Sequence, residues 1–122
     1  MDQDQALRVL RADDLALLRQ RATWAIARAE SGKQTRLTHW NRAVLAVIDD
    51  EEQRRRGLSG TIRDADHCLR SAAASLTERE IFLLSMDYQI TIDDVEVHWG
   101  RSYIPFLTTL RNTLHHQLSR QR

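Results

Sequence analysis

The sequence predicts an all-α protein, a single-domain bundle of five or six helices, on three observations. Only four glycines and one proline occur among the 122 residues, so long stretches lack the residues that end helices. Apolar residues recur at spacings of three and four, the period of an amphipathic helix. The hydrophobic fraction of 42% supports one core, and a chain of this length forms one domain over residues 1–122.

The first quarter of the chain predicts a short lead-in helix and one long helix. The lead-in is expected over residues 3–11. Asp13 or Asp14 can cap the long helix, which runs to Glu30 and is stopped by Gly32. Its predicted core face consists of Leu15, Leu18, Ala22, Ile26 and Ala29.

Two further helices are predicted in the middle of the chain. One is expected over residues 38–56, ending at Gly57, and a weaker one over residues 61–74. The first has a predicted core face of Leu37, Trp40, Val44, Val47 and Ile48, and the second one of Ile62, Ala65, Leu69 and Ala72.

The last third of the chain is predicted to form three helical segments. Thr77 and Glu80 form a capping box, in which each side chain satisfies the other's backbone amide, and this box opens a helix through about residue 88. Thr91 is expected to cap a short helix that closes at Gly100. Ser102 is expected to cap the last helix, over residues 103–120, whose core face is Leu107, Leu110, Leu114 and Leu118.

No catalytic residue, metal site or cofactor is predicted. Neighbouring residues on a helix point about 100° apart, so neither His67 with Cys68 nor His115 with His116 makes a chelating pair by itself. The helix after Asp14 is similar to the first helix of the all-helical chorismate mutases, but the acidic and amide partners that this family needs downstream are not found. We therefore expect no enzyme and no small-molecule substrate.

Composition indicates a cytoplasmic protein without a membrane segment. No apolar run approaches the roughly 18 residues that span a bilayer, and the acidic, polar amino terminus does not resemble a secretory signal. Cys68 is the only cysteine, which excludes an internal disulfide and fits a reducing compartment. The formal net charge of +1 provides no overall attraction for nucleic acid.

Arginine clusters suggest two surfaces. Residues 54–56 are all arginine, but each has an acidic residue four positions earlier, which favours a self-neutralised helix end. On the long second helix, Leu17, Arg21, Trp24 and Arg28 form one stripe away from the core face. An aromatic ring between two arginines suits phosphate contact and base stacking. Packing of this stripe on a neighbouring helix or subunit is the alternative, and either interpretation favours an assembly.

The carboxy-terminal half resembles the helix-turn-helix of winged-helix and LuxR-like regulators. Residues 75–114 have the same order of elements as these regulators: an opening helix, a short helix that closes on Gly100, and a longer helix. The predicted recognition helix offers no Arg, Lys, Asn or Gln to a base edge before Arg111, and acidic residues precede it. We expect the helix-turn-helix geometry, with sequence-specific DNA binding as an alternative function.

As a whole, the chain is similar to the small subunit of class 1, Cascade-like CRISPR–Cas effector complexes. The similarity is one of size, helical class and an arginine-rich amino-terminal half. It implies a non-catalytic subunit that packs along a backbone of protein subunits and contacts guide RNA or a displaced, single-stranded DNA. The residues implied in these contacts are Arg21, Trp24 and Arg28, then Arg8, Arg11 and Arg19. A transcriptional regulator and a protein-only interaction module, such as an antitoxin or phage inhibitor, are the alternatives.

Overall fold

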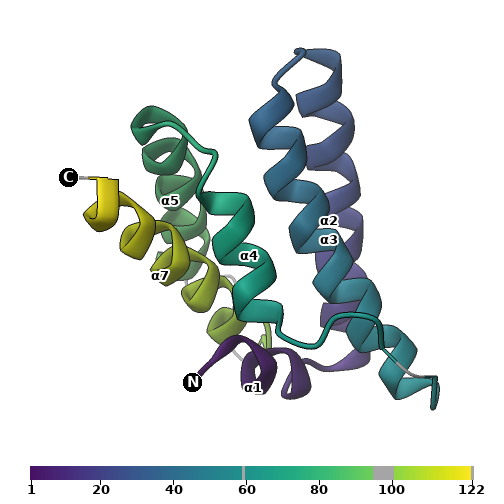
Figure 1. The fold of residues 1–122 in the computed structure, drawn as a ribbon. Coiled ribbons are helices and arrows are strands. Elements are labelled where there is room, and N and C mark those ends of the chain that lie inside the picture. Colours follow the sequence, from purple (N-terminus) through teal and green to yellow (C-terminus); the bar gives the residue numbers. More distant parts are fainter. Residues whose placement is uncertain (59, 95–100, 122) are drawn as a thin grey trace.

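The computed structural model describes residues 1–58, 60–94 and 101–121, and the regular structure of this part is entirely helical. The predicted all-α fold is therefore confirmed (Figure 1). The helices are α1 (Gln3–Arg8), α2 (Ala12–Ser31), α3 (Thr35–Arg55), α4 (Ala65–Ala73), α5 (Glu78–Asp93) and α7 (Ile104–Gln121).

Two antiparallel helix pairs make up most of the bundle. α2 packs along α3, and α5 packs along α7. α4 lies between the two pairs and contacts α3 and α7, while α1 crosses the base against α3, α4 and α7 (Figure 1). In Figure 1 the upper ends of α2 and α3 extend beyond the other helices. α1 and α4 thus connect the two pairs at one end of the bundle.

Trp40 and Tyr88 join the two helix pairs in the core. The Trp40 side chain is fully buried, and its indole N–H donates a hydrogen bond to the Tyr88 hydroxyl at 3.0 Å. Burial raises the pKa of Tyr88 to about 12, against the smaller opposing effect of the Trp40 hydrogen bond. The predicted core faces are confirmed for the following buried residues: Leu15, Leu18, Ala22, Ala29, Trp40, Val44, Val47, Ile48, Ala65, Leu69, Ala72, Leu107, Leu110 and Leu114.

Local capping signals place some helix ends correctly. The capping box of Thr77 and Glu80 is present at the start of α5. The predicted start of α4 at Thr61 is wrong, because Asp64 caps this helix by accepting a hydrogen bond from the His67 amide. The amide of Thr61 instead donates to the buried carboxylate of Asp50 at 2.6 Å, which ties the segment before α4 to α3.

The predicted break between residues 88 and 91 is also wrong. α5 continues to Asp93, and Thr91 lies inside it with its hydroxyl donating to the Asp87 carbonyl at 3.2 Å. Asp93 and Asp94 therefore stand at the carboxy-terminal end of a helix and not in a first turn. The rest of the short helix predicted to close at Gly100 falls on residues 95–100, outside the described part of the chain.

Asp14 does not cap α2, and Ser102 does not cap α7, because the two residues bind each other. α2 begins at Ala12 after Arg11, and the fully buried Asp14 carboxylate accepts hydrogen bonds from the Ser102 amide and hydroxyl, both at 2.6 Å. The Ser102 hydroxyl in turn accepts from the Arg11 amide at 2.8 Å. Arg101 adds an ion pair to Asp14 at 3.2 Å. This cluster fixes the start of α2 to the segment that leads into α7.

The same contacts set the ionisation of Asp14. Burial raises the pKa of this carboxyl, but the Ser102 hydrogen bonds, with the charges of Arg101 and Arg11, outweigh burial and hold the pKa below its ordinary value. The ionised form is therefore the one that stabilises the fold. Its contribution is present in full above the ordinary pKa of about 3.9 and declines as the pH falls below that value toward the lowered one.

We expect Asp14→Ala to lower the free energy of unfolding at neutral pH by about 1–3 kcal/mol, because it leaves the half-buried Ser102 amide without its acceptor. Urea unfolding at neutral pH measures this loss. Ser102→Ala is the matched control, since it keeps the amide donor and should cost less. The difference between wild type and Asp14→Ala should shrink below pH 4 or so; a constant difference across this range would contradict the assignment.

Candidate functional site

The stripe predicted on α2 is present at the surface, but its four residues have different surroundings. Trp24 is 61% exposed and Leu17 38% exposed. Arg28 is exposed, whereas Arg21 is half-buried. The structure thus separates the stripe into an apolar part with Arg28 and a single arginine that reaches toward α5.

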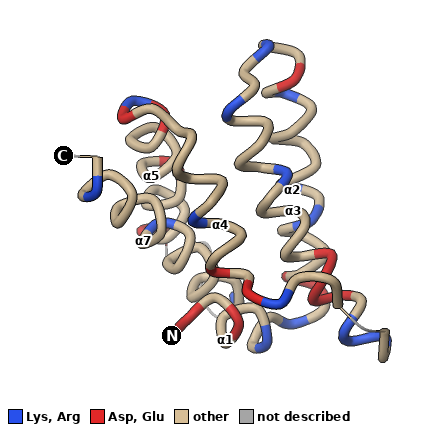
Figure 2. The backbone as a smooth tube through the Cα atoms, viewed as in Figure 1, with Lys and Arg blue, Asp and Glu red and all other residues tan. Residues whose placement is uncertain are grey.

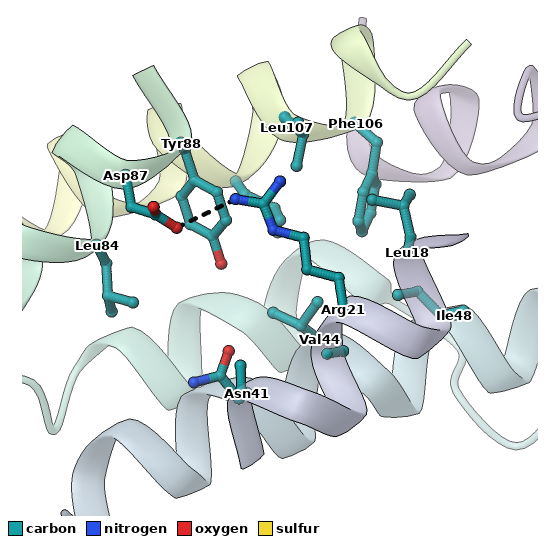
Figure 3. A pocket seen from close by; sticks show the side chains of 13 residues that line it. Leu18, Arg21, Asn41, Val44, Ile48, Leu84, Asp87, Tyr88, Phe106 and Leu107 are labelled. Atoms are coloured by element: carbon teal, nitrogen blue, oxygen red, sulfur yellow. Dashed lines mark hydrogen bonds and ion pairs between the residues drawn. The ribbon is translucent and has the colours of Figure 1, made fainter. Parts of the chain in front are cut away.

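Arg21 spans the gap between the two helix pairs. Its guanidinium donates to the Asp87 carboxylate at 3.2 Å (Figure 3) and to the Thr91 hydroxyl at 3.1 Å, and both residues lie on α5. Beneath it lies a cavity of about 100 Å³, lined mainly by apolar side chains of α2, α3, α5 and α7. In Figure 3 the Arg21 side chain extends across this cavity toward Asp87. Arg21 therefore bridges α2 and α5 instead of pointing into solvent.

Two of the secondary arginines are also bound to carboxylates. Arg19 pairs with Asp49 and Glu52 of α3, with its Nε donating to Glu52 at 3.0 Å. Arg11 lies 3.5 Å from Asp14 and 4.0 Å from Asp13. Both signs of charge are mixed along this end of the bundle (Figure 2). Phosphate binding by either arginine would compete with an existing ion pair.

Arg8, at the end of α1, is exposed. It lies on another helix from Trp24, so the six predicted nucleic-acid residues do not share one helix face. Trp24 and Arg28 do lie together, with the guanidinium carbon 5.3 Å from the centre of the indole ring. Of the six predicted residues, Trp24 and Arg28 are therefore the two that lie side by side and exposed, as expected for an aromatic ring next to an arginine.

An open groove beside Trp24 includes a residue that the sequence analysis did not place there. Leu17, Leu18, Gln20, Arg21, Trp24 and Tyr103 line this groove, which has a volume of about 370 Å³. Tyr103 comes from the segment before α7, and the Arg101 guanidinium lies 5.7 Å from its ring centre. The Asp14–Ser102 cluster positions Tyr103, because Ser102 precedes it directly. No local sequence signal indicates this long-range pairing. We call these six residues the α2 groove.

The arginine triplet at the end of α3 is neutralised as predicted at two of its three positions. Arg54 pairs with Asp50 at 2.9 Å and Arg55 with Glu51 at 3.3 Å. The predicted third pair is wrong, because Glu52 binds Arg19. Arg55 also donates to the carbonyls of Leu7 and Leu10, at 2.9 and 2.7 Å, so it holds the end of α1.

The start of α7 presents little that could recognise DNA bases. Phe106, Leu107 and Leu110 are buried, and the Thr108 hydroxyl donates to the Ile104 carbonyl at 2.9 Å. Arg111, the first polar candidate for a base edge, donates to Gln89 at 2.6 Å. The apolar face of the predicted recognition helix thus packs in the core, and its polar groups are bonded within the chain.

Residues 1–58, 60–94 and 101–121 contain Cys68 and four of the five histidines of the chain. This part of the chain brings together no three His, Cys, Asp or Glu side chains that could hold a metal ion. Cys68 is half-buried, and burial raises the pKa of its thiol, which disfavours the nucleophilic thiolate. No helix of the described residues is both long and apolar enough to cross a membrane.

Comparison with known proteins identifies no relative: no family model matches the sequence, and neither a curated protein nor a solved structure shows significant similarity. Fold and site geometry are therefore the basis for a functional assignment.

Trp24 and Trp40 should differ in how much their mutation destabilises the fold. We expect Trp24→Ala to change the free energy of unfolding by less than about 1 kcal/mol, because it removes only an exposed cation–π contact. Trp40→Phe should cost about 1–3 kcal/mol, since it removes the buried donor to Tyr88. Denaturant unfolding of the two variants measures both values. A large loss for Trp24→Ala would show that this ring supports the fold.

Proposed function

We propose that this chain is a non-catalytic helical subunit of a larger assembly, and that it binds a partner protein through the α2 groove. The observation that carries the proposal is the exposure of Trp24 beside Leu17 and Tyr103, with Arg28 over the indole ring. Tryptophan and arginine are the residues most enriched among those that dominate binding at protein interfaces. An apolar helical segment of a partner, with an acidic residue opposite Arg28, fits this surface.

The ion pairs of the other arginines favour a protein partner over nucleic acid. Phosphate contacts supply most of the affinity of a non-specific nucleic-acid-binding protein. Arg11, Arg19 and Arg21 already bind carboxylates of the same chain. A partner that binds mainly by burying apolar surface would leave these three intramolecular ion pairs intact. The raised pKa of the Cys68 thiol disfavours this residue as a nucleophile, and a single cysteine is compatible with a cytoplasmic setting.

A second candidate is a ribonucleoprotein subunit, the class suggested by the similarity to CRISPR–Cas small subunits. The specific observation in its favour is again the Trp24–Arg28 pair, because an exposed indole can stack on a base while the adjacent guanidinium contacts a phosphate. Arg8 provides a further exposed cation. This candidate uses the same groove but predicts a different dependence on salt and on nuclease.

Capture from native cells tests the first candidate. With the full-length tagged chain as bait, we expect a co-purifying protein that survives nuclease treatment. Trp24→Ala should reduce its recovery tenfold or more, in line with about 2 kcal/mol for a central interface aromatic. Leu58→Ala is the matched control, because Leu58 is 59% exposed and lies outside the groove. Recovery that Trp24→Ala leaves unchanged would exclude the α2 groove as the binding surface.

Salt dependence tests the second candidate. If Arg28 contacts a phosphate, Arg28→Ala should make the slope of log affinity for single-stranded RNA or DNA against log salt shallower by roughly 0.7–0.9. Arg19→Ala should leave the slope unchanged, because Arg19 is held by Asp49 and Glu52. Fluorescence anisotropy with a labelled oligonucleotide measures both slopes. Equal slopes for wild type and Arg28→Ala would remove the nucleic-acid candidate.

A further inference from the structure

α5 has a second apolar surface on the side away from the core. Phe82, Leu83, Met86 and Ile90 are 60, 46, 44 and 63% exposed. Their spacing of one, three and four residues places all four on one side of the helix. Ile81, Ser85 and Tyr88 are buried and face the core instead. We call the four exposed residues the α5 face.

Charged residues stand at both ends of the α5 face. Arg79 lies one turn before Phe82 and Leu83, and Asp93 lies one turn beyond Ile90. Arg79 and Asp93 are each seven residues from Met86, so their Cα atoms are separated by about 21 Å with Met86 midway. The face is therefore apolar along its middle, with one positive side chain at its first end and one negative side chain at its last. Glu78 and Glu80 share the first turn with Arg79 but point about 100° to either side of it.

Arg79 and Asp93 both have the sign of charge that the helix dipole disfavours at their positions. The amino-terminal end of a helix favours anions and the carboxy-terminal end favours cations. Arg79 is in the first turn of α5, where Glu78 and Glu80 do suit the dipole, whereas Asp93 closes the last turn and no basic residue stands there. The Asp93 carboxylate accepts from the Gln89 side chain at 2.7 Å, but this contact lies on the same helix. Helix stability alone therefore does not account for Arg79 and Asp93.

We infer that the α5 face binds a second copy of this chain, with the two α5 helices antiparallel and related by a twofold axis near Met86. In this arrangement Arg79 of each copy lies opposite Asp93 of the other, and Phe82 lies opposite Ile90. A twofold interface uses the same patch on both copies, so the patch must complement itself. The α5 face meets this requirement only when antiparallel, because a parallel pair would place Arg79 against Arg79 and Asp93 against Asp93.

The size of the face sets the expected strength of the dimer. Four apolar side chains on one helix form a small interface, of the kind found in weak or transient complexes. We therefore expect a dimer that forms in a concentration-dependent way, with a Kd on the order of micromolar. The end pairs are exposed to solvent, so added salt should weaken them while the apolar middle persists. The residues of this interface differ from those of the α2 groove, and the inference does not depend on the proposed function.

Variants that reverse the charge at one end of the α5 face test the inference. Sedimentation velocity of the full-length chain over a concentration series should show a monomer–dimer equilibrium. Arg79→Asp alone and Asp93→Arg alone should each raise the Kd about tenfold or more, because each places like charges opposite one another. An equimolar mixture of the two variants should dimerise as wild type does, since both end pairs then become complementary. Both changes suit the helix dipole, so neither should unfold α5.

Two controls separate this interface from others. Val9→Asp should leave the Kd unchanged, because Val9 is 47% exposed and lies outside the α5 face. Met86→Glu should abolish the dimer by placing two carboxylates at the twofold axis, with circular dichroism confirming that the helices persist. A wild-type chain that stays monomeric throughout overturns the inference. A dimer whose Kd neither single charge variant changes, or a variant mixture that stays monomeric, overturns it as well.

Discussion

The buried carboxylate of Asp14 is the constraint on which the arrangement of the bundle depends. It joins residues 88 positions apart, because its two hydrogen bonds from Ser102 hold the start of α2 against the segment that leads into α7. A buried charge is costly unless hydrogen bonds and opposite charges compensate it, so this contact tolerates few other geometries. Tyr103, which follows Ser102, is thereby placed in the α2 groove. A structural requirement of the core thus determines the shape of the surface that we propose to bind a partner.

Local sequence signals predicted what depends on near neighbours. The periodic apolar faces of α2, α3 and α7 needed only helical spacing, and the Thr77–Glu80 box needed only three residues. Errors occurred where a distant residue changed the outcome. Asp14 and Ser102 both resemble helix caps, but each satisfies the other across the bundle. The break expected after Tyr88 rested on Thr91 as a helix cap, yet α5 runs past it to Asp93, and the Thr91 hydroxyl binds the Asp87 carbonyl of the same helix.

The candidate site was predictable in its apolar part and not in its charged part. Trp24 fell outside the core face by helical spacing alone, and the structure exposes it. The state of each arginine depends on which helix lies opposite. Arg19 meets acidic residues of α3 because α2 and α3 pair antiparallel, and Arg21 meets Asp87 because α5 lies across the cavity. The composition shows nearly equal numbers of basic and acidic residues, but the fold determines which of them form ion pairs.

Arg21 also gives the two exposed surfaces a structural connection. Its partners Asp87 and Thr91 lie on α5 beside Leu83 and Ile90, whereas its own neighbours on α2 are Leu17 and Trp24. The ion pair is solvent-accessible, so its net contribution to stability is small, about 0–1 kcal/mol. Its side chain nevertheless spans from α2 to α5 over the cavity of about 100 Å³. A partner bound at the α2 groove and a second copy bound at α5 would therefore each act on a helix that Arg21 ties to the other surface.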